Sequence, residues 1–240
     1  MWIKLCATTN LDDALLAADA GADAIGFVFA PSPRRVTAGQ IAAFLPDLPG
    51  DLTRIGVFNT QDFDEIVFTL QSTGLHGAQL HGELDFALAE RLRSQFDPGF
   101  FLVQTLHWDV NGDPARAAVR LRDELRAIAR HSVADAILLD ARTAAAAGGT
   151  GRTLDWPRAH DVLAEEAGTL RIILAGGLTA ENVAEAIQTL RPWGVDVASG
   201  VEFRPGRKDP VRVECFISAA RRAFAEIENT TLPLAARPPQ

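Results

Sequence analysis

Short apolar runs alternate with longer amphipathic segments along nearly the whole chain. The runs are rich in Val, Ile, Leu and Phe without strict alternation, a pattern typical of strands buried on both faces. They span Trp2–Cys6, Ala24–Phe29, Thr53–Val57, Gly77–Leu80, Phe100–Thr105, Ala136–Leu139, Arg171–Ala175 and Val195–Ala198. The segments between them carry apolar residues at helical spacing, with charges on the opposite side. Five such predicted helices span Leu11–Ala20, Gln61–Thr73, Leu84–Phe96, Trp156–Ala167 and Ala180–Leu190.

Eight strand–helix units predict an α/β fold, a single closed (β/α)8 TIM barrel with a parallel eight-stranded barrel and outer helices. A last helix from about Asp209 to Glu228 completes the pattern. We expect residues 1–228 to form one catalytic domain and residues 229–240, with three prolines and no helical pattern, to form a disordered tail. Residues 107–132 lengthen the fifth unit, and their Arg-rich second half predicts a helix. A solvated surface helix is the simplest interpretation, and a part in dimerisation is the alternative.

Composition narrows the class of partner. A net charge of −8 disfavours nucleic acid, because proteins that bind it usually carry a basic surplus. Two cysteines do not make a disulfide framework, and no CxxC or Cys/His cluster indicates zinc. No signal-peptide pattern or apolar stretch of about 18 residues is evident. We therefore expect a cytoplasmic monomer or homodimer that binds a small molecule and neither nucleic acid nor a membrane.

Polar and glycine residues gather where the predicted strands end. In a barrel of this type the carboxyl ends of the strands carry the active site. The candidates are Cys6 after strand one, Arg34 and Arg35 after strand two, Gln79, His81 and Glu83 at strand four, Asp140 at strand six, and Gly149 and Gly151 in the loop that follows it. We interpret that loop, "ARTAAAAGGTGRT", as a mobile cover over the site.

Two small-residue segments predict a phosphate site. Gly176 and Gly177 stand just before a predicted helix, and Ser199 and Gly200 directly follow the eighth strand. Small residues let backbone N–H groups approach an anion, and loops seven and eight are the recurrent phosphate position in such barrels. Two ordinary tight turns are the alternative interpretation, which the joint occurrence of both segments disfavours.

Two strand ends have more than one interpretation from position alone. Asp140 follows an entirely apolar run, so it is either a cap for the next loop or a catalytic acid. Cys6 is either a small apolar residue that fills a strand end or a reactive thiol. Cys215 lies in the middle of a predicted helix and is interpreted as a packing residue.

The ordered set of motifs resembles the phosphoribosylanthranilate isomerases of tryptophan biosynthesis. The matching segments are "KLCATTNLDDALLAADAGADAIGFVFAPSPRR", "IGVF", "GAQLHGE", "ILLDAR…GGTGRTLDW", "ILAGGLTAENVAEAI" and "GVDVASGVE…PGRKD", from Lys4 to about Asp209. The resemblance implies an Amadori rearrangement of N-(5-phosphoribosyl)anthranilate to 1-(2-carboxyphenylamino)-1-deoxyribulose 5-phosphate, without metal or organic cofactor. It also implies Cys6 as general base, Asp140 as general acid, and Arg34 or Arg35 as the ligand of the anthranilate carboxylate.

The chemistry suits these implied roles, and one residue departs from the family pattern. Desolvation raises the pKa of a carboxyl, so Asp140 can protonate a ring oxygen near neutral pH, and a thiolate with a pKa near ambient pH can remove the C2 proton. Ala7 stands where the family has glycine, which strains the turn if its φ is positive. The alternatives are another sugar-phosphate barrel, such as indole-glycerol-phosphate synthase or the histidine-pathway isomerase, and a non-catalytic phosphometabolite-binding barrel. The thiol at Cys6 argues against the first group.

Overall fold

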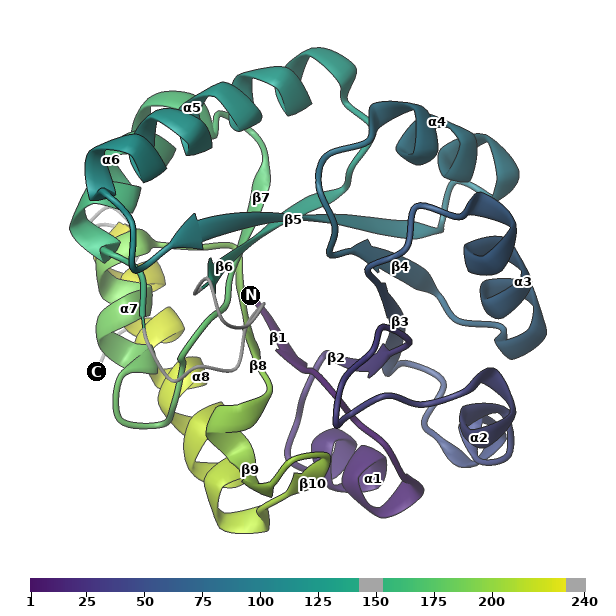
Figure 1. Ribbon diagram of the computed structural model, residues 1–240. Helices are drawn as coiled ribbons and strands as arrows, with labels where there is room; N and C mark the ends of the chain where they lie inside the picture. Colours follow the sequence, from purple (N-terminus) through teal and green to yellow (C-terminus); the bar gives the residue numbers. More distant parts are fainter. Residues whose placement is uncertain (143–152, 232–240) are drawn as a thin grey trace.

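The computed structural model describes residues 1–142 and 153–231. Figure 1 shows a ring of strands surrounded by helices, with the amino terminus opening into the first strand. The predicted cover loop, with Gly149 and Gly151, and the last residues of the predicted tail lie outside these described residues.

The eight strands form a closed barrel in sequence order, and the parallel pairing of β1 with β8 closes the ring, which confirms the predicted fold. Strand β5 continues past the predicted Thr105 and pairs with β6 as far as Asp109 opposite Arg142. His107 is therefore a strand residue next to Asp140, and not part of the extra segment predicted from the sequence. The strands are β1 (Trp2–Leu5), β2 (Ala24–Val28), β3 (Thr53–Phe58), β4 (Gly77–Leu80), β5 (Phe101–Asp109), β6 (Ala136–Arg142), β7 (Arg171–Leu174) and β8 (Gly194–Val197).

Helices follow the strands and cover the outside of the barrel (Figure 1). They are α1 (Leu11–Asp19), α2 (Ala38–Ala42), α3 (Phe63–Thr73), α4 (Phe86–Gln95), α5 (Pro114–His131), α6 (Trp156–Glu166), α7 (Val183–Leu190) and α8 (Pro210–Thr231), with two short 3-10 helices, η1 (Leu45–Asp47) and η2 (Ser199–Val201). The helix α8 continues past the predicted end at Glu228 to Thr231. Cys215 on this helix is exposed, so its interpretation as a packing residue is wrong.

Local sequence signals account for several helix ends. The Asn10 side chain accepts a hydrogen bond from the Asp13 backbone at 3.0 Å, as its position before α1 predicts. Gly74 ends α3 with φ 67°, a left-handed conformation that glycine adopts without strain. The Arg-rich segment after residue 107 becomes α5, which begins after Asp113 and buries Leu121 and Leu125 against the barrel. It is thus an ordinary outer helix of the barrel with a solvated basic face.

The barrel interior has an apolar end and a polar end. A cluster that includes Trp2, Val103 and Ile173 fills the amino-terminal side, where Trp2 also stacks on Trp193. Residues two apart along a strand share a face, so each strand sends alternate side chains inward. On several strands the last inward positions are polar and buried, which places ionisable groups under the carboxyl-terminal rim. They include Lys4, Gln79, Asp140 and Asp196.

A short antiparallel hairpin follows β8 and leads into α8. Its strands are β9 (Glu202–Arg204) and β10 (Arg207–Lys208). The hairpin folds Lys208 back under the end of β1, where its side chain is fully enclosed. The chain thus uses residues that are far apart in sequence to build one side of the rim.

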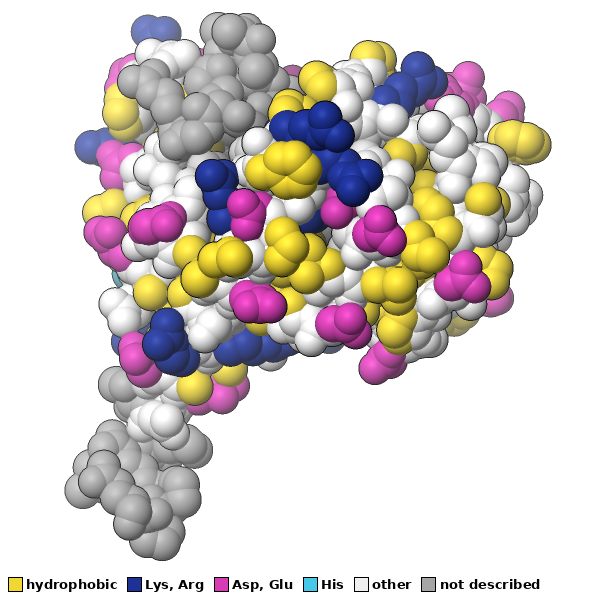
Figure 2. Space-filling model, turned by 90° about the horizontal axis from the view of Figure 1, so that it is seen from below, with side chains coloured by type: hydrophobic (Ala, Val, Ile, Leu, Met, Phe, Trp, Pro, Cys, Tyr) yellow, Lys and Arg dark blue, Asp and Glu magenta, His cyan; other side chains and the backbone are white. Residues whose placement is uncertain are grey.

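The outer surface carries charges of both signs. On the face seen in Figure 2, acidic and basic side chains are interspersed with apolar ones, and no extended basic surface covers that face. Among the described helices, none combines the length and the apolar character needed to cross a membrane.

Candidate active site

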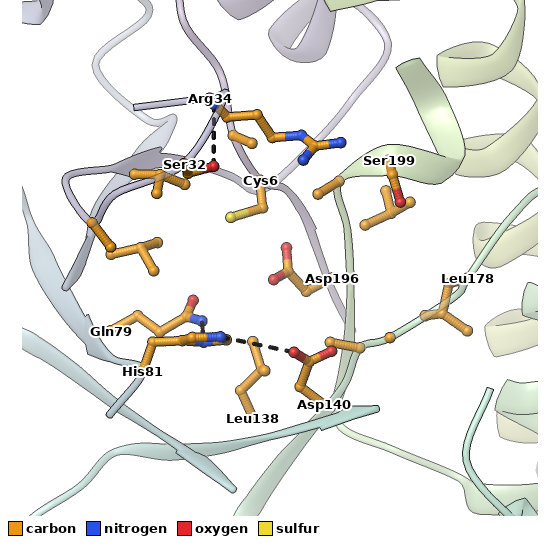
Figure 3. A pocket seen from close by; sticks show the side chains of 18 of the residues that line it. Cys6, Ser32, Arg34, Gln79, His81, Leu138, Asp140, Leu178, Asp196 and Ser199 are labelled. Atoms are coloured by element: carbon orange, nitrogen blue, oxygen red, sulfur yellow. Dashed lines mark hydrogen bonds and ion pairs between the residues drawn. The ribbon is translucent and has the colours of Figure 1, made fainter. Parts of the chain in front are cut away.

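A cavity of about 200 Å³ opens at the carboxyl ends of the barrel strands (Figure 3). The structure brings together most residues that the sequence predicts for the site, from loops and strands at both ends of the chain. Those that line the cavity are Cys6, Arg34, Gln79, His81, Asp140, Gly176, Gly177, Ser199 and Gly200. Arg35 is exposed and is not part of the lining.

Asp140 is a buried carboxyl near the end of β6. Burial, together with the nearby negative charge of Asp196, raises its pKa from the ordinary 3.8 to about 7, although Lys4 and the Ala141 backbone act in the opposite direction. The His81 Nε2 atom lies 3.9 Å from Asp140 Oδ2, and Figure 3 shows the two side chains facing each other across the cavity. A large share of Asp140 therefore keeps its proton at neutral pH and can act as an acid.

Cys6 lies just beyond the end of β1, where its backbone N–H still donates to Val197 at 2.8 Å. Burial raises the pKa of its thiol, Lys4 and Lys208 lower it, and the net effect is a pKa above the ordinary value. Burial thus outweighs both ammonium groups at this thiol.

Ala7 has φ 62°, so the turn after Cys6 does adopt the left-handed backbone that glycine favours. Its methyl group is buried, and the chain accommodates it. The backbone strain that the sequence analysis made conditional on a positive φ is therefore present at Ala7, and glycine would relieve it.

A buried ion pair lies beneath the thiol. Lys4 Nζ donates to Asp196 Oδ2 at 2.8 Å and to Gln79 Oε1 at 3.0 Å, across the barrel interior. Burial opposes the charge of Lys4, yet Asp196 and Cys6 together raise the pKa of its ammonium group. The second oxygen of Asp196 has no hydrogen-bond partner among the described residues, and Asp196 lines the cavity.

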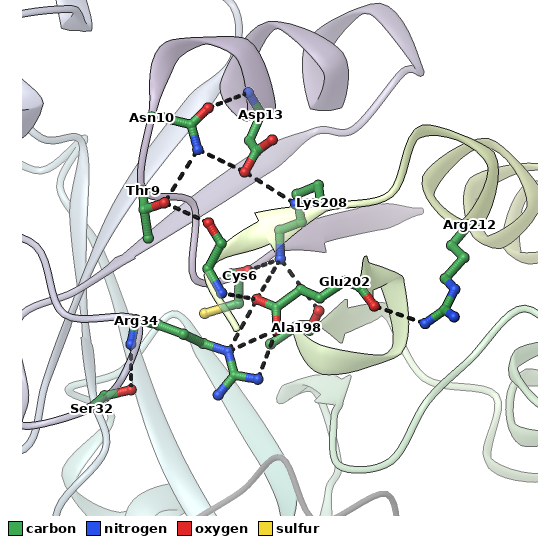
Figure 4. Close-up of polar contacts among 11 residues, drawn as sticks. Cys6, Thr9, Asn10, Asp13, Ser32, Arg34, Ala198, Glu202, Lys208 and Arg212 are labelled. Atoms are coloured by element: carbon green, nitrogen blue, oxygen red, sulfur yellow. Dashed lines mark hydrogen bonds and ion pairs between the residues drawn. The ribbon is translucent and has the colours of Figure 1, made fainter. Parts of the chain in front are cut away.

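Arg34 is held by Glu202 in a network shown in Figure 4. Its Nε lies 2.9 Å and its Nη2 2.7 Å from Glu202 Oε2. Lys208 Nζ approaches the other Glu202 oxygen at 3.5 Å and donates to the Cys6 carbonyl at 2.5 Å. Glu202 thereby fixes the guanidinium at the cavity wall, while Lys208 fixes the backbone that carries the thiol.

The loops after β7 and β8 each need glycine at one close backbone contact, with β6 in the first case and between the two loops in the second. A Cβ on Gly176 would overlap the Ala141 backbone, and one on Gly200 would overlap the Leu178 carbonyl. Gly176 also has φ 84°. These contacts explain the glycines structurally, and they bring exposed backbone of both loops to one end of the cavity next to Ser199.

Three side chains at the rim have the geometry of a possible metal site. One ligand atom each of His81, His107 and Asp140 lies within 4.8 Å of the others. The register explains the group, because β5 places His107 opposite Asp140. The resemblance implies chemistry without a metal, and the carboxyl in this group is the one that burial keeps partly protonated.

The sequence analysis missed four polar residues that organise the site: Lys4, Asp196, Glu202 and Lys208. The strand pattern contained a signal for two of them, because Lys4 and Asp196 stand two residues before Cys6 and Ala198 and so share their inward face. Glu202 and Lys208 gave no periodic signal, since they belong to the irregular hairpin after β8.

The barrel and a strand-end cavity that gathers a protonatable carboxyl, a thiol and two glycine-rich loops define an enzyme of the (β/α)8 class that acts on a small molecule. The family model for N-(5'-phosphoribosyl)anthranilate isomerase matches residues 3–219. The chain belongs to this family of isomerases of tryptophan biosynthesis.

Individual relatives agree. The enzyme of this name from Pelobacter propionicus is 42% identical over 227 residues, which cover 93% of this chain and 97% of the relative. The crystal structure of the Thermotoga maritima phosphoribosylanthranilate isomerase covers 92% of this chain and 99% of its own, with a TM-score of 0.78 at 32% identity. A further structure, solved in complex with reduced 1-(o-carboxyphenylamino)-1-deoxyribulose 5-phosphate, has a TM-score of 0.74 at 30% identity, with coverage of 92% and 99%. The family assignment sets aside the two other sugar-phosphate enzymes and the non-catalytic barrel.

Proposed function

We propose that the chain converts N-(5-phosphoribosyl)anthranilate into 1-(2-carboxyphenylamino)-1-deoxyribulose 5-phosphate, with Asp140 as the general acid and Cys6 as the general base. The observation that carries the proposal is that one cavity contains a carboxyl with a pKa of about 7 and a buried thiol. A related structure holds a reduced form of this product, which supports the same ligand class for this cavity.

The first step opens the ribose ring. The proton of Asp140 passes to the ring oxygen while the C1–O bond breaks and the anthranilate nitrogen forms a double bond with C1. An ordinary aspartate would be almost fully ionised at neutral pH, whereas a pKa near 7 leaves about half of the carboxyl groups protonated. The buried position of Asp140 therefore supports the role of acid.

The second step removes a proton from C2. The iminium at C1 acidifies this carbon, and the Cys6 thiolate takes the proton to leave an enolamine. The enolamine becomes the aminoketone when C1 gains a proton and the C2 hydroxyl loses one. The substrate nitrogen donates its lone pair to C1 in the first step and takes an electron pair back in the second, so the chemistry runs on the side chains and the substrate alone.

Two anchors would hold the substrate between acid and base. Ser199 and the glycines at 176, 177 and 200 suit the phosphate, because small residues expose backbone N–H groups there. Arg34 suits the anthranilate carboxylate, since its guanidinium is fixed by Glu202 at the cavity wall, and exposed Arg35 does not line the cavity. The unpartnered oxygen of Asp196 suits a ribose hydroxyl. Fixed ends bring C1 and C2 to the reacting groups.

The test is turnover of phosphoribosylanthranilate generated in situ, followed by loss of its fluorescence. Asp140→Asn and Cys6→Ser should each lower kcat by several orders of magnitude, because asparagine has no acidic proton to give and a serine hydroxyl is hardly ionised at neutral pH. Titration with a reduced product analogue should give Kd values close to wild type in both variants, which shows that the site is intact. Near-normal kcat in either variant would remove that residue from its role.

A further inference from the structure

The chain contains only two lysines among its 23 basic residues, and both lie at Cys6. Lys208 donates to the Cys6 backbone carbonyl, whereas Lys4 reaches the side chain. All other basic positions are arginine. A compact ammonium group fits where a planar guanidinium does not, so confinement of the barrel interior accounts for lysine at position 4.

The space around the thiol is shaped for this contact. A Cβ on Gly26 of β2 would lie 2.8 Å from Cys6 Sγ, 2.9 Å from Lys4 Cε and 3.1 Å from Lys4 Nζ. The thiol and the ammonium group therefore share the gap that the glycine leaves. Any larger residue at position 26 would push the two groups out of this arrangement.

The hydrogen bonds of Lys4 also point to the thiol. An ammonium group has three N–H donors. One goes to Asp196 Oδ2 at 2.8 Å and another to Gln79 Oε1 at 3.0 Å. The Cys6 side chain lies beside the same ammonium group and interacts with it electrostatically. Two fixed acceptors on β8 and β4 thus hold the ammonium group next to the sulfur and leave its third N–H bond for the thiolate.

We infer that Lys4 is a positioning residue for the isomerase reaction: its ammonium group, held by Asp196 and Gln79, stabilises the thiolate of Cys6. The inference rests on the proposed role of Cys6 as base. The charged and titratable groups that face the thiol are Lys4 on its own strand, Asp196 on β8 and Lys208 on β10. Of these, Lys4 has the largest effect on the thiol pKa, which it lowers, and Asp196 opposes it.

A purely structural role is the competing explanation, because buried ion pairs often fix a fold without taking part in chemistry. A structural pair would change stability when removed, while the proton affinity of Cys6 would stay the same. The decisive measurement is therefore the thiol pKa itself. It is read from the alkylation rate with iodoacetamide between pH 6 and 10.5, in a Cys215→Ser background that leaves Cys6 as the remaining thiol.

Lys4→Met should raise the alkylation pKa by about one unit or more, the usual effect of an adjacent opposite charge. In the fluorescence assay kcat at pH 7.5 should fall by about tenfold or more, as the thiolate fraction falls, and should recover as the pH rises. Lys4→Met alone leaves the Asp196 carboxylate buried without its partner, which destabilises the fold. The double variant Lys4→Met/Asp196→Asn removes both charges and should also raise the alkylation pKa.

Lys208→Met is the matched control, because it makes the same change at the other buried lysine, whose hydrogen bond goes to the carbonyl of Cys6. Its thiol shift should be smaller than that of Lys4→Met. An unchanged alkylation pKa in both Lys4 variants, or an equal shift in Lys208→Met, would overturn the inference. A shifted pKa with wild-type turnover would leave the ammonium–thiolate contact standing and would refute Cys6 as the base.

Discussion

Asp140→Asn should stabilise the protein at alkaline pH, even though we expect it to lower kcat by several orders of magnitude. The native carboxyl is buried, and its pKa of about 7 lies far above the 3.8 of a solvated aspartate. Above the pKa of the unfolded state, the folded protein therefore loses stability, because it must either keep a proton that the unfolded chain releases or bury a carboxylate. Asparagine has nearly the same shape and never ionises, so it removes this cost.

The sign and size follow from proton linkage. Below pH 3.8 both folded and unfolded states are protonated at Asp140, and above pH 7 both are ionised. Between these values only the folded state holds the proton, so stability falls as the pH rises, by about 1.4 kcal/mol per unit. The loss between pH 5 and pH 8 is thus about 3 kcal/mol, and it stops near pH 7.

Urea unfolding of both proteins at several values between pH 5 and pH 8 measures this. The stability advantage of Asp140→Asn over wild type should grow by about 3 kcal/mol across the series. All other titrating groups are common to both proteins and cancel in the difference. Asp62→Asn, the same change at an exposed helix cap, controls for removal of an aspartate as such. An advantage that stays constant with pH would refute the raised pKa of Asp140.

Three further outcomes are expected. kcat/KM should rise about tenfold per pH unit up to pH 7, then level off, and fall only above the ordinary thiol pKa. The reason is that the active form holds protonated Asp140 and the Cys6 thiolate at the same time. A pH–rate series whose rise ends more than about one unit from pH 7 would contradict this. Arg34→Ala should raise KM by about tenfold or more through loss of a charged hydrogen bond, and exposed Arg35→Ala should leave KM nearly unchanged; equal small effects in initial-rate assays would exclude both arginines from the carboxylate site. Ala7→Gly relieves a φ of 62° and should raise the unfolding free energy by up to about 1 kcal/mol; a loss of stability in urea would show that the buried methyl outweighs the strain.

The fold could be predicted from the sequence because barrel strands are buried on both faces and so produce continuous apolar runs. Six of the eight runs end within one residue of the observed strand ends. The run at β6 ends three residues early, because Asp140 and Arg142 continue the ladder beyond the apolar residues. The predicted strand β5 ended too early for a similar reason. Its last residues include the polar His107 and Asp109, which interrupt the apolar run although their backbone still pairs with β6.

The site was only partly predictable. Residues at strand ends, such as Cys6 and Asp140, could be found because the fold dictates where strand ends meet. The choice between Arg34 and Arg35 depends on a loop conformation, in which Glu202 draws Arg34 inward and leaves Arg35 in solvent. Glu202 belongs to the hairpin after β8, and its pairing across 168 residues has no local sequence pattern.

The proposed reaction needs a protonated acid and a thiolate in the same cavity, and burial by itself favours only the protonated acid. Burial raises the pKa values of Asp140 and Cys6 alike. The Lys4–Asp196 ion pair shifts the two pKa values in opposite directions, because its positive and negative ends act differently on the two groups. Of the two charges, Asp196 has the larger effect on Asp140 and raises its pKa, whereas Lys4 has the larger effect on Cys6 and lowers its pKa. A single buried dipole under the rim therefore favours the protonated carboxyl and the thiolate together, which is the combination that the proposed reaction requires.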